Sequence, residues 1–589
     1  MRIIFPTLLM LMCSTIHAQW SVLEGDPRLA TQKDDWNLYQ PFTRDEWNAS
    51  NFAKPEDMKW FNDARYGMFI HFGLNSYVNK DMSWPIVYNR KAPDNGHGAY
   101  PDSAWQKVWP SLFKLERFNA DKWVQTAKDA GMKYITVIAK HNDGFHMWDT
   151  KYSDFKITNT PFKRDYLKEI IDACHRAKMP VGIYYSQRDW YHPDYAPIDT
   201  NLIKRISAPP FFEALPGKKI AQGPTHKKYI EYQFNVVEEL LTKYGKIDIF
   251  WFDAVWYGNM FTADMWDAEK LTRMIRKLQP GIIINNRTSL PGDFDTPEQR
   301  VGMYQQRPWE SAMTLNGSWG FDPSHKVYPV KDLVKQMLMT AAGNGNMLLS
   351  WGARFNGEWD KAQKDTLLKI GKWLKKYGNA YYGTQGGPWM PASAYGTVHR
   401  DNRVYIYVFE WKQEGLILPL LKNNKIIKAA FLNIPERLDW KKNTTNYQFS
   451  KPSSAGAIVT IIELTMEKPV KETDVSAPQD TRDEFAYGEV IVTKDIGPGD
   501  WNDNQMIIDL EKPKNVTRIG LFNNNSKIDI QGSLNANEWE DIGVATGEKQ
   551  EFGITTFMTG VEVPGKNLRY IRLRNNGKRE AVNLKVFAK

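Results

Sequence analysis

The stretch KIDIFWFD at residues 246–253 is an apolar run that ends in a carboxylate. Its apolar residues follow one another without alternation, which is typical of a strand that is buried on both faces. Runs of the same kind occur at residues 67–72, 134–140, 181–185, 282–285 and 346–350. They are short and rich in β-branched and aromatic residues, so they predict a parallel sheet.

Helical patterns lie between these runs, at residues 120–130, 165–177, 228–243 and 331–342. The repeated alternation of strand and helix over residues 45–380 predicts a catalytic domain with a (β/α)8-like TIM barrel. A doubly wound sheet is the alternative, but nothing in this region resembles the glycine-rich phosphate turn of that fold.

The pattern changes near residue 383, where apolar and polar residues begin to alternate. Residues 383–466 predict a β-sandwich, with strands near 404–409, 426–432 and 457–464. A charged stretch at 467–483 is typical of a linker. Residues 484–589 predict a second all-β domain of jelly-roll type, with strands near 487–492, 506–510, 518–522, 528–533 and 570–574.

The first 18 residues have the features of a secretory signal peptide. Arg2 supplies a positive charge, an apolar run covers residues 3–12, and Ala18 precedes the expected cleavage point. We therefore expect a periplasmic or extracellular protein without a transmembrane segment. Cys174 would be alone in the mature chain, so no intrachain disulfide is expected.

Composition narrows the function further. The net charge is +9, but the positive residues are scattered and form no basic cluster, so nucleic acid is not an expected partner. The 23 Trp and 27 Tyr residues are numerous enough to suggest clefts that stack on the apolar faces of sugar rings. The sequence carries no signal for an oligomeric state.

Polar side chains follow the predicted strands. They include His71, His141 with Asn142, Tyr184, Asp253 and Arg287, and a loop farther on carries Glu298. In a TIM barrel the carboxyl ends of the strands form the active site, and two carboxylates are the minimal equipment for glycoside hydrolysis. Each residue also has an ordinary interpretation: an Asp can cap a helix, an Arg can pair with a structural acid, and Glu298 can be a plain loop residue.

Other hydrolytic chemistries lack their signals. His71 and His141 lie on different predicted strands, and neither an HExxH motif nor a Cys/His cluster is present. No G-x-S-x-G turn follows a strand. We therefore expect neither a metal nor another cofactor.

Six motifs, taken together, resemble the α-L-fucosidases of glycoside hydrolase family 29 in the family's order. They are GMFIHFG (67–73), AKHNDGF (139–145), IFWFD (249–253), GDFDTPEQ (292–299), GSWG (317–320) and GNMLL (345–349). The resemblance covers roughly residues 45–465, which includes the β-sandwich. It implies an exo-acting retaining enzyme that acts on oligosaccharides or polysaccharides bearing terminal fucose.

By this resemblance Asp253 would be the nucleophile and Glu298 the general acid/base, with Glu310 as the rival for the second role. The residues that would bind the sugar are His71, His141, Asn142, Tyr184, Trp251, Arg287 and Trp319.

The chain departs from the family pattern at three places. Asn142 stands where the family usually has a second histidine, residues 83–88 replace a glutamate-tryptophan-tyrosine region, and residues 350–353 replace an Asn-x-Gly-Pro pattern. A carboxamide differs from an imidazole in reach and does not titrate. The alternatives are therefore an enzyme for an L-galactoside or a modified fucose, or a catalytically weakened carbohydrate-binding protein.

The last domain resembles the discoidin-like (coagulation factor type C) modules. The stretches that carry this resemblance are residues 532–539 and 568–573. Such a module implies either a sugar-binding or a purely structural role.

Overall fold

The computed structural model describes residues 48–83, 104–189, 191–195, 224–253, 263–288, 290–299, 301, 304, 307–392, 394–456, 458–471, 489–496, 500–522, 527–546, 559–575 and 582–588. The predicted signal peptide, residues 84–88 of the loop after the first strand, and the predicted linker from residue 472 onward lie outside these ranges.

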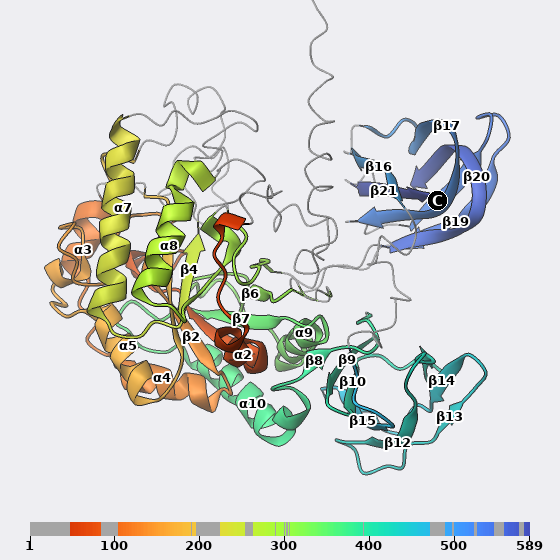
Figure 1. The fold of residues 1–589 in the computed structure, drawn as a ribbon, viewed down its shortest axis with the longest axis horizontal. Coiled ribbons are helices and arrows are strands. Elements are labelled where there is room, and N and C mark those ends of the chain that lie inside the picture. Colours follow the sequence, from red (N-terminus) through yellow and green to blue (C-terminus); the bar gives the residue numbers. More distant parts are fainter. Residues whose placement is uncertain are drawn as a thin grey trace, which may run out of the picture. The chain divides into compact units, whose positions relative to one another are not determined.

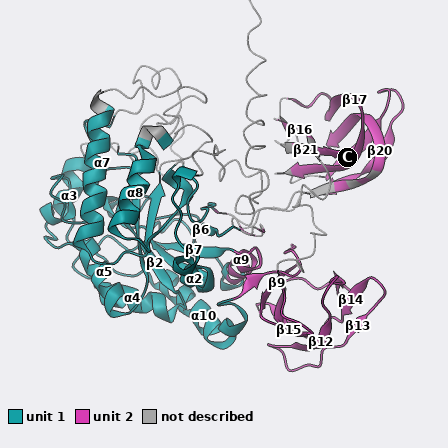
Figure 2. Cartoon of the chain, in the orientation of Figure 1, with its two compact units in different colours: residues 1–298, 305–333, 345–383 teal, residues 299–304, 334–344, 384–589 magenta. Residues whose placement is uncertain are grey.

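The chain divides into two compact units (Figure 2). Unit 1 comprises residues 1–298, 305–333 and 345–383, and unit 2 comprises residues 299–304, 334–344 and 384–589. The boundary at residues 383 and 384 falls where the sequence changes from strand–helix alternation to strands alone.

A parallel sheet forms the centre of unit 1 (Figure 1). Its strands are β1 (Tyr66–Ile70), β2 (Tyr134–Lys140), β3 (Val181–Ser186), β4 (Ile249–Asp253), β5 (Ile283–Ile284), β6 (Glu310–Thr314) and β7 (Asn346–Trp351). They are hydrogen-bonded in the order β5-β4-β3-β2-β1-β7-β6, and every residue in them is buried. Burial on both faces explains why these strands appear in the sequence as continuous apolar runs.

A strand-like segment at residues 293–298 joins the two edges of this sheet. On one side Phe294 bridges Asn285, directly after β5, and on the other Asp295 and Glu298 bridge Trp309 and Ala312. The segment therefore takes the position between β5 and β6, and strand positions follow one another in chain order around a TIM-like barrel.

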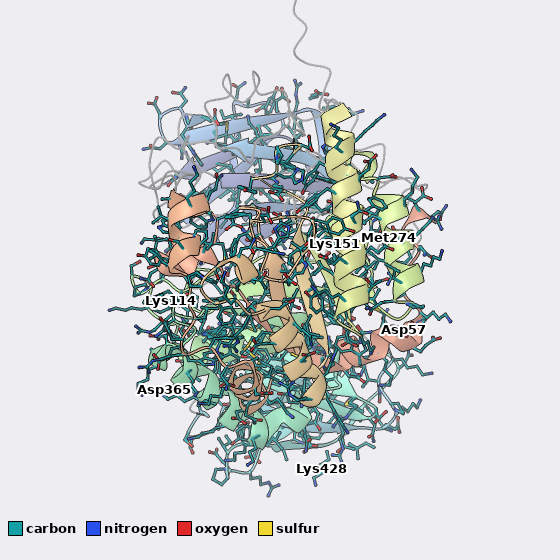
Figure 3. All side chains as sticks on the ribbon, turned by 90° about the vertical axis from the view of Figure 1, so that its left-hand side faces the viewer. Asp57, Lys114, Lys151, Met274, Asp365 and Lys428 are labelled. Carbon is teal, nitrogen blue, oxygen red and sulfur yellow. The ribbon has the colours of Figure 1, made fainter. Side chains whose placement is uncertain are left out.

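Helices cover the outside of this sheet (Figure 1). They are α2 (Pro55–Ala64), α4 (Ala120–Asp129), α5 (Tyr166–Arg176), α7 (Pro224–Lys243), α8 (Ala268–Leu278) and α10 (Lys361–Tyr377), with a short α3 (Trp109–Leu112). A further helix, α9 (Val330–Ala342), has residues in both units. Asn119, Asp165 and Asp360 each accept a backbone N–H at the start of a helix, as N-cap residues do. In Figure 3, Met274 of α8 and Lys151 beside α7 lie toward the outer surface.

The barrel interior is packed with large side chains. Phe69, Tyr184 and Trp251 belong to one buried cluster with Phe294 of the strand-like segment and Ala312 of β6. Because Phe294 belongs to this cluster, the segment at 293–298 contributes to the core as a strand does.

Unit 2 contains antiparallel sheets. A five-stranded sheet has the order β12-β15-β10-β9-β8, and a three-stranded sheet has the order β11-β14-β13. Their strands are β8 (Gln385–Gly386), β9 (Tyr395–Arg400), β10 (Arg403–Val408), β11 (Leu416–Pro419), β12 (Ile426–Phe431), β13 (Trp440–Lys442), β14 (Asn446–Phe449) and β15 (Thr460–Met466). Val404, Leu418 and Phe449 share one core, so the two sheets pack as a sandwich.

The rest of unit 2 is a six-stranded sheet of order β16-β21-β17-β20-β18-β19. Its strands are β16 (Glu489–Ile496), β17 (Gln505–Phe522), β18 (Lys527–Ser533), β19 (Glu540–Thr546), β20 (Thr559–Asn575) and β21 (Val582–Ala588). It has its own core, which includes Ile519, Ile571 and Val586. The expected all-β character is present, and the discoidin-like class stays a prediction.

Two details of the sequence analysis need correction. The predicted strands at 506–510 and 518–522 are parts of one long strand, β17. Strand β6 was not predicted, because Glu310 and Ser311 interrupt its apolar character.

Among the helices of the described ranges, none combines the length and the apolar character needed to cross a membrane.

Candidate active site

Asp253 is the last residue of β4, and two hydrogen-bond donors hold its carboxylate. Tyr184 on the neighbouring strand β3 donates its hydroxyl to Oδ2 at 2.7 Å, and Arg287 donates from Nη1 to Oδ1 at 2.9 Å. Each oxygen therefore has a fixed partner. Burial, and then the negative charge of Asp253, raise the pKa of Tyr184 well above its usual value, so Tyr184 stays a neutral donor.

The guanidinium of Arg287 connects the two predicted catalytic carboxylates. Besides its bond to Asp253, it donates from Nη2 to Oε2 of Glu298 at 3.3 Å. Burial lowers the pKa of Arg287, but the charges of Asp253 and Glu298 outweigh this, and the pKa rises above its usual value. Arg287 is therefore a permanent cation between two acids.

Glu298 is the more accessible of the two acids. Its side chain is 39% exposed, whereas that of Asp253 is 10% exposed. Because Glu298 lies in the strand-like segment at 293–298 and bridges Ala312 of β6, its backbone is held by the barrel. Its position is thus better defined than that of the loop residue expected from the sequence.

The motif GDFDTPE at 292–298 is explained mostly by structure. A side chain on Gly292 would collide with the backbone of Asn285, so the chain can pass there only without one. Asp293 accepts from the backbone N–H groups of Ala53 and Ile284, and it also pairs with Arg276. The two aspartates of the motif therefore fasten the segment, since Asp295 pairs in the same way with Arg307.

Thr296 of the same motif positions Arg287. Its hydroxyl accepts from Nε at 3.0 Å, its carbonyl accepts from Nη2 at 3.0 Å, and the hydroxyl donates to Asn286 at 2.9 Å. Nothing in the sequence distinguishes Thr296 from the other residues of this motif.

His71 follows β1 and is buried. Its Nδ1 lies 2.9 Å from the hydroxyl of Ser350, which in turn donates to the carbonyl of Trp319 at 2.8 Å. Because that bond uses the hydroxyl hydrogen of Ser350, Nδ1 of His71 must be the donor and Nε2 the acceptor. Burial and the neighbouring His141 hold the pKa of His71 well below its usual range.

His141 follows β2, and its Nδ1 lies 2.6 Å from the hydroxyl of Ser83. Burial lowers its pKa to about 4, against the opposing effect of Asp253. Both predicted sugar-binding imidazoles are therefore neutral near pH 7, and each can exchange hydrogen bonds with sugar hydroxyls.

A stack of rings lies beside the carboxylates. His141 stacks on Tyr184 with centroids 5.6 Å apart, and Tyr184 stacks on Trp251 with centroids 5.5 Å apart. Arg287 lies over Trp251 at 5.0 Å from the ring centroid. Trp319 packs beside His71 at 5.1 Å. The predicted residues His71, His141, Tyr184, Trp251, Arg287 and Trp319 are thus brought to one region.

Asp81 is a further acid in this region, and the sequence analysis missed it. Its Oδ1 accepts from the backbone N–H of Trp319 at 3.2 Å. Burial raises its pKa to about 7, partly offset by the backbone N–H groups of Trp319 and Gly320, and the charge of Glu298 adds to the increase. No sequence pattern marks it, because its partner is 238 positions away.

Asn142 and Glu310 form hydrogen bonds with residues other than the two predicted catalytic acids. The carboxamide oxygen of Asn142 accepts from Ser186 at 2.5 Å, and the residue is fully buried. Glu310 is fully buried inside the barrel, where one carboxylate oxygen accepts from Tyr134 and the other from Trp251. Neither oxygen of Glu310 is open to a leaving group, so the geometry disfavours Glu310 as the acid/base.

Lys140 and Asp189 form a fully buried ion pair behind the site, with 3.0 Å between Nζ and Oδ2. Removing either partner of such a pair would leave the other as an uncompensated buried charge. Within the described part of the chain, no group of three or more His, Cys, Asp or Glu side chains could hold a metal ion.

Paired carboxylates, an arginine and an aromatic wall at the strand ends of a TIM-like barrel are the features expected of a glycoside hydrolase. The family model described as alpha-L-fucosidase matches residues 37–379, and the chain belongs to the α-L-fucosidase family. It is therefore an enzyme, a glycoside hydrolase of the α-L-fucosidase type.

Individual relatives agree with this assignment. The human plasma alpha-L-fucosidase is 27% identical over 391 residues, covering 60% of this chain and 77% of the relative. The structure of alpha-L-fucosidase isoenzyme 1 from Paenibacillus thiaminolyticus is 30% identical with a TM-score of 0.58, covering 70% of this chain and 99% of that one. An alpha-L-fucosidase structure from Bacteroides thetaiotaomicron is 25% identical with a TM-score of 0.61, covering 71% and 96%.

Proposed function

We propose that the enzyme is an exo-acting, retaining α-L-fucosidase that releases terminal α-L-fucosyl residues from glycans by double displacement. Asp253 is the nucleophile and Glu298 the general acid/base. The observation that carries this proposal is the position of Arg287, whose guanidinium bonds to both carboxylates. One group thus holds the two acids on which the two-step mechanism depends.

The different environments of the two acids support their different roles. Asp253 is nearly buried and held by Tyr184 and Arg287, as a nucleophile needs when its oxygen must meet the anomeric carbon in one orientation. Glu298 is more exposed, so it can reach the leaving oxygen in the first step and a water molecule in the second.

Neutral imidazoles and rings provide the sugar-binding groups. Nε2 of His71 can accept a hydrogen bond from a sugar hydroxyl. His141 and Trp251 are the two ends of a ring stack with Tyr184 in the middle. An aromatic surface of this kind suits the apolar face and the methyl group of fucose.

A relative supports the covalent step. One Bacteroides thetaiotaomicron α-L-fucosidase structure is described as a trapped covalent intermediate with 2-fluoro-fucosyl fluoride, obtained with a glutamate-to-glutamine variant. That protein is 25% identical to this chain. A glycosyl–enzyme intermediate is what double displacement requires.

The stereochemistry of the product tests this function. Proton NMR of the first sugar released from an aryl α-L-fucoside should show the α anomer, which later converts to the equilibrium mixture. A β anomer as the first product would contradict double displacement. Parallel assays with an aryl α-L-galactoside decide the glycone, since faster turnover of that substrate would contradict the fucoside assignment.

We also propose that the enzyme is exported, on the basis of the signal-like residues 1–18. Mass spectrometry of the protein from the producing cells should show a chain that begins at Gln19. A chain that keeps Met1 would contradict export by this route.

A further inference from the structure

Glu310 is a carboxylate in the interior of the barrel, where a charged group is costly. It is the first residue of β6, it is fully buried, and its partners come from the other strands β2 and β4. Replacing a buried polar network with apolar side chains often leaves stability unchanged or improves it. A carboxylate at this place is therefore poorly explained by stability alone.

Both oxygens of Glu310 are engaged. One accepts from the Tyr134 hydroxyl, and the other accepts from the indole Nε1 of Trp251 at 2.9 Å. Burial raises the pKa of Glu310 to about 7, and the two hydrogen bonds oppose this increase. The indole has a single polar atom, a donor, so Glu310 fixes the rotation of the Trp251 ring.

The Trp251 ring in turn contacts the groups that hold the nucleophile. Arg287 lies over it at 5.0 Å, and Tyr184 stacks on it at 5.5 Å with an interplanar angle of 23°. These two residues are the donors to the carboxylate of Asp253. A rotation of the indole would therefore move both donors.

We propose that Glu310 is a positioning residue for catalysis, which acts through Trp251 to hold Arg287 and Tyr184 in place around Asp253. It touches neither the substrate nor the reacting atoms. This inference rests on the proposed role of Asp253, and it assigns a function to an acid that the two-carboxylate mechanism leaves without one.

The test is a double-mutant cycle with Glu310→Leu and Trp251→Phe, measured as kcat and KM on an aryl α-L-fucoside. Glu310→Leu leaves the indole N–H without an acceptor, so kcat/KM should fall by about 10- to 100-fold, chiefly through kcat. Phenylalanine has no N–H, so in the Trp251→Phe background the same change should cost less than about threefold. Equal losses in both backgrounds would overturn the proposal.

Two further variants separate positioning from folding. Glu310→Gln keeps an oxygen for the indole and should stay within about fivefold of wild-type kcat/KM. Tyr134→Phe removes the other hydrogen bond of the same carboxylate without touching the indole, and it should change kcat/KM by less than about threefold. A loss in Tyr134→Phe as large as that in Glu310→Leu would show a merely structural role and overturn the inference.

The outcome remains readable if Glu310→Leu does not fold, because Glu310→Gln is then compared in the wild-type and Trp251→Phe backgrounds. A loss in Glu310→Gln beyond about fivefold that persists unchanged in Trp251→Phe would overturn the inference. A different experiment tests the proposed function: turnover by a variant that lacks the Asp253 carboxylate would contradict it. Failure of the proposed function can therefore be distinguished from failure of the role inferred for Glu310.

Discussion

The hydroxyl of Tyr184 donates to Oδ2 of Asp253 across 2.7 Å, from one strand end to the next. Strands β3 and β4 are paired in register, with Ser186 opposite Asp253, so the contact is set by the sheet rather than by a loop. A short bond to a charged acceptor is directional. Together with the contact of Arg287 to Oδ1, it fixes the orientation of the carboxylate.

Removing this hydroxyl is the first prediction. Hydrogen bonds to charged groups contribute roughly 1.5–3 kcal/mol, so Tyr184→Phe should lower kcat/KM by about 10- to 100-fold while the fold is kept. Steady-state kinetics on an aryl α-L-fucoside measure the loss. Tyr185→Phe is the matched control, because Tyr185 is the next residue of the same strand and its ring packs against Lys140. Equal losses in the two variants would refute a specific role for Tyr184.

The double contact of Arg287 leads to the second prediction. Arg287→Lys keeps a positive charge but loses the planar group that reaches Asp253, Glu298 and Thr296 together, so kcat/KM should still fall by at least about tenfold. Arg287→Ala, which leaves two carboxylates without their cation, should lose more. The control is Arg176→Ala, which breaks an exposed pair with Asp121. Wild-type kinetics in Arg287→Lys would show that charge alone is needed.

The third prediction concerns pH and stability through His141. Its pKa is about 4 in the folded protein against an ordinary value of 6.5, so the unfolded chain takes up its proton first. The resulting stability is complete above the unfolded value and is lost as the pH falls toward the folded one. Between about pH 7.5 and about pH 5 the loss should be about 2 kcal/mol.

Urea unfolding at these two pH values, in the wild type and in His141→Asn, measures this effect. The wild type should lose about 2 kcal/mol more than the variant, because asparagine does not titrate. Groups away from the site change both proteins alike, so the difference reports on His141 and on its effect on His71. Identical pH dependence in the two proteins would contradict the neutral, buried state of this imidazole.

Much of the barrel could be predicted because its strands are buried on both faces. Continuous apolar runs such as 134–140 and 346–350 mark β2 and β7 almost to the residue. Strand β6 could not be found in this way, because Glu310 interrupts its apolar character, and the hydrogen bonds that stabilise this acid come from Tyr134 on β2 and Trp251 on β4. The contacts that place β6 in the sheet join residues that are far apart in the sequence, so no local sequence pattern reveals them.

The candidate site, like the barrel, could be predicted from the sequence only in part. Asp253 is visible in the sequence because it ends an apolar strand, but Asp81 is not, since its bond to Trp319 spans 238 positions. Asn142 is a different case. Its place in a motif suggested a sugar contact, and the structure shows its carboxamide oxygen bonded to Ser186, so the sugar contact stays a prediction.

The nucleophile provides the fourth prediction. Asp253→Gly should abolish turnover of natural fucosides, because the carboxylate that attacks the anomeric carbon is missing. Azide should fit the space that is left and restore activity on an activated fucoside, giving a β-fucosyl azide by a single displacement. NMR of the azide product decides its configuration. Substantial hydrolysis by Asp253→Gly without azide would show that another group attacks the sugar.

The last prediction separates the two roles of Glu298. With a substrate whose leaving group needs no proton, Glu298→Ala should still form the glycosyl–enzyme, because Asp253 is intact. It should then stall, since no base activates water for the second step. A burst of leaving group equal to the enzyme concentration, followed by a slow steady rate, is the expected trace. Intact-mass spectrometry should show one fucosyl unit added to the protein, and a peptide containing Asp253 should carry it.

Glu310→Gln is the comparison variant. Because the carboxyl group of Glu310 is enclosed by Tyr134 and Trp251, this variant should show no burst. If Glu310→Gln gave the burst and Glu298→Ala did not, the acid/base assignment would pass to Glu310.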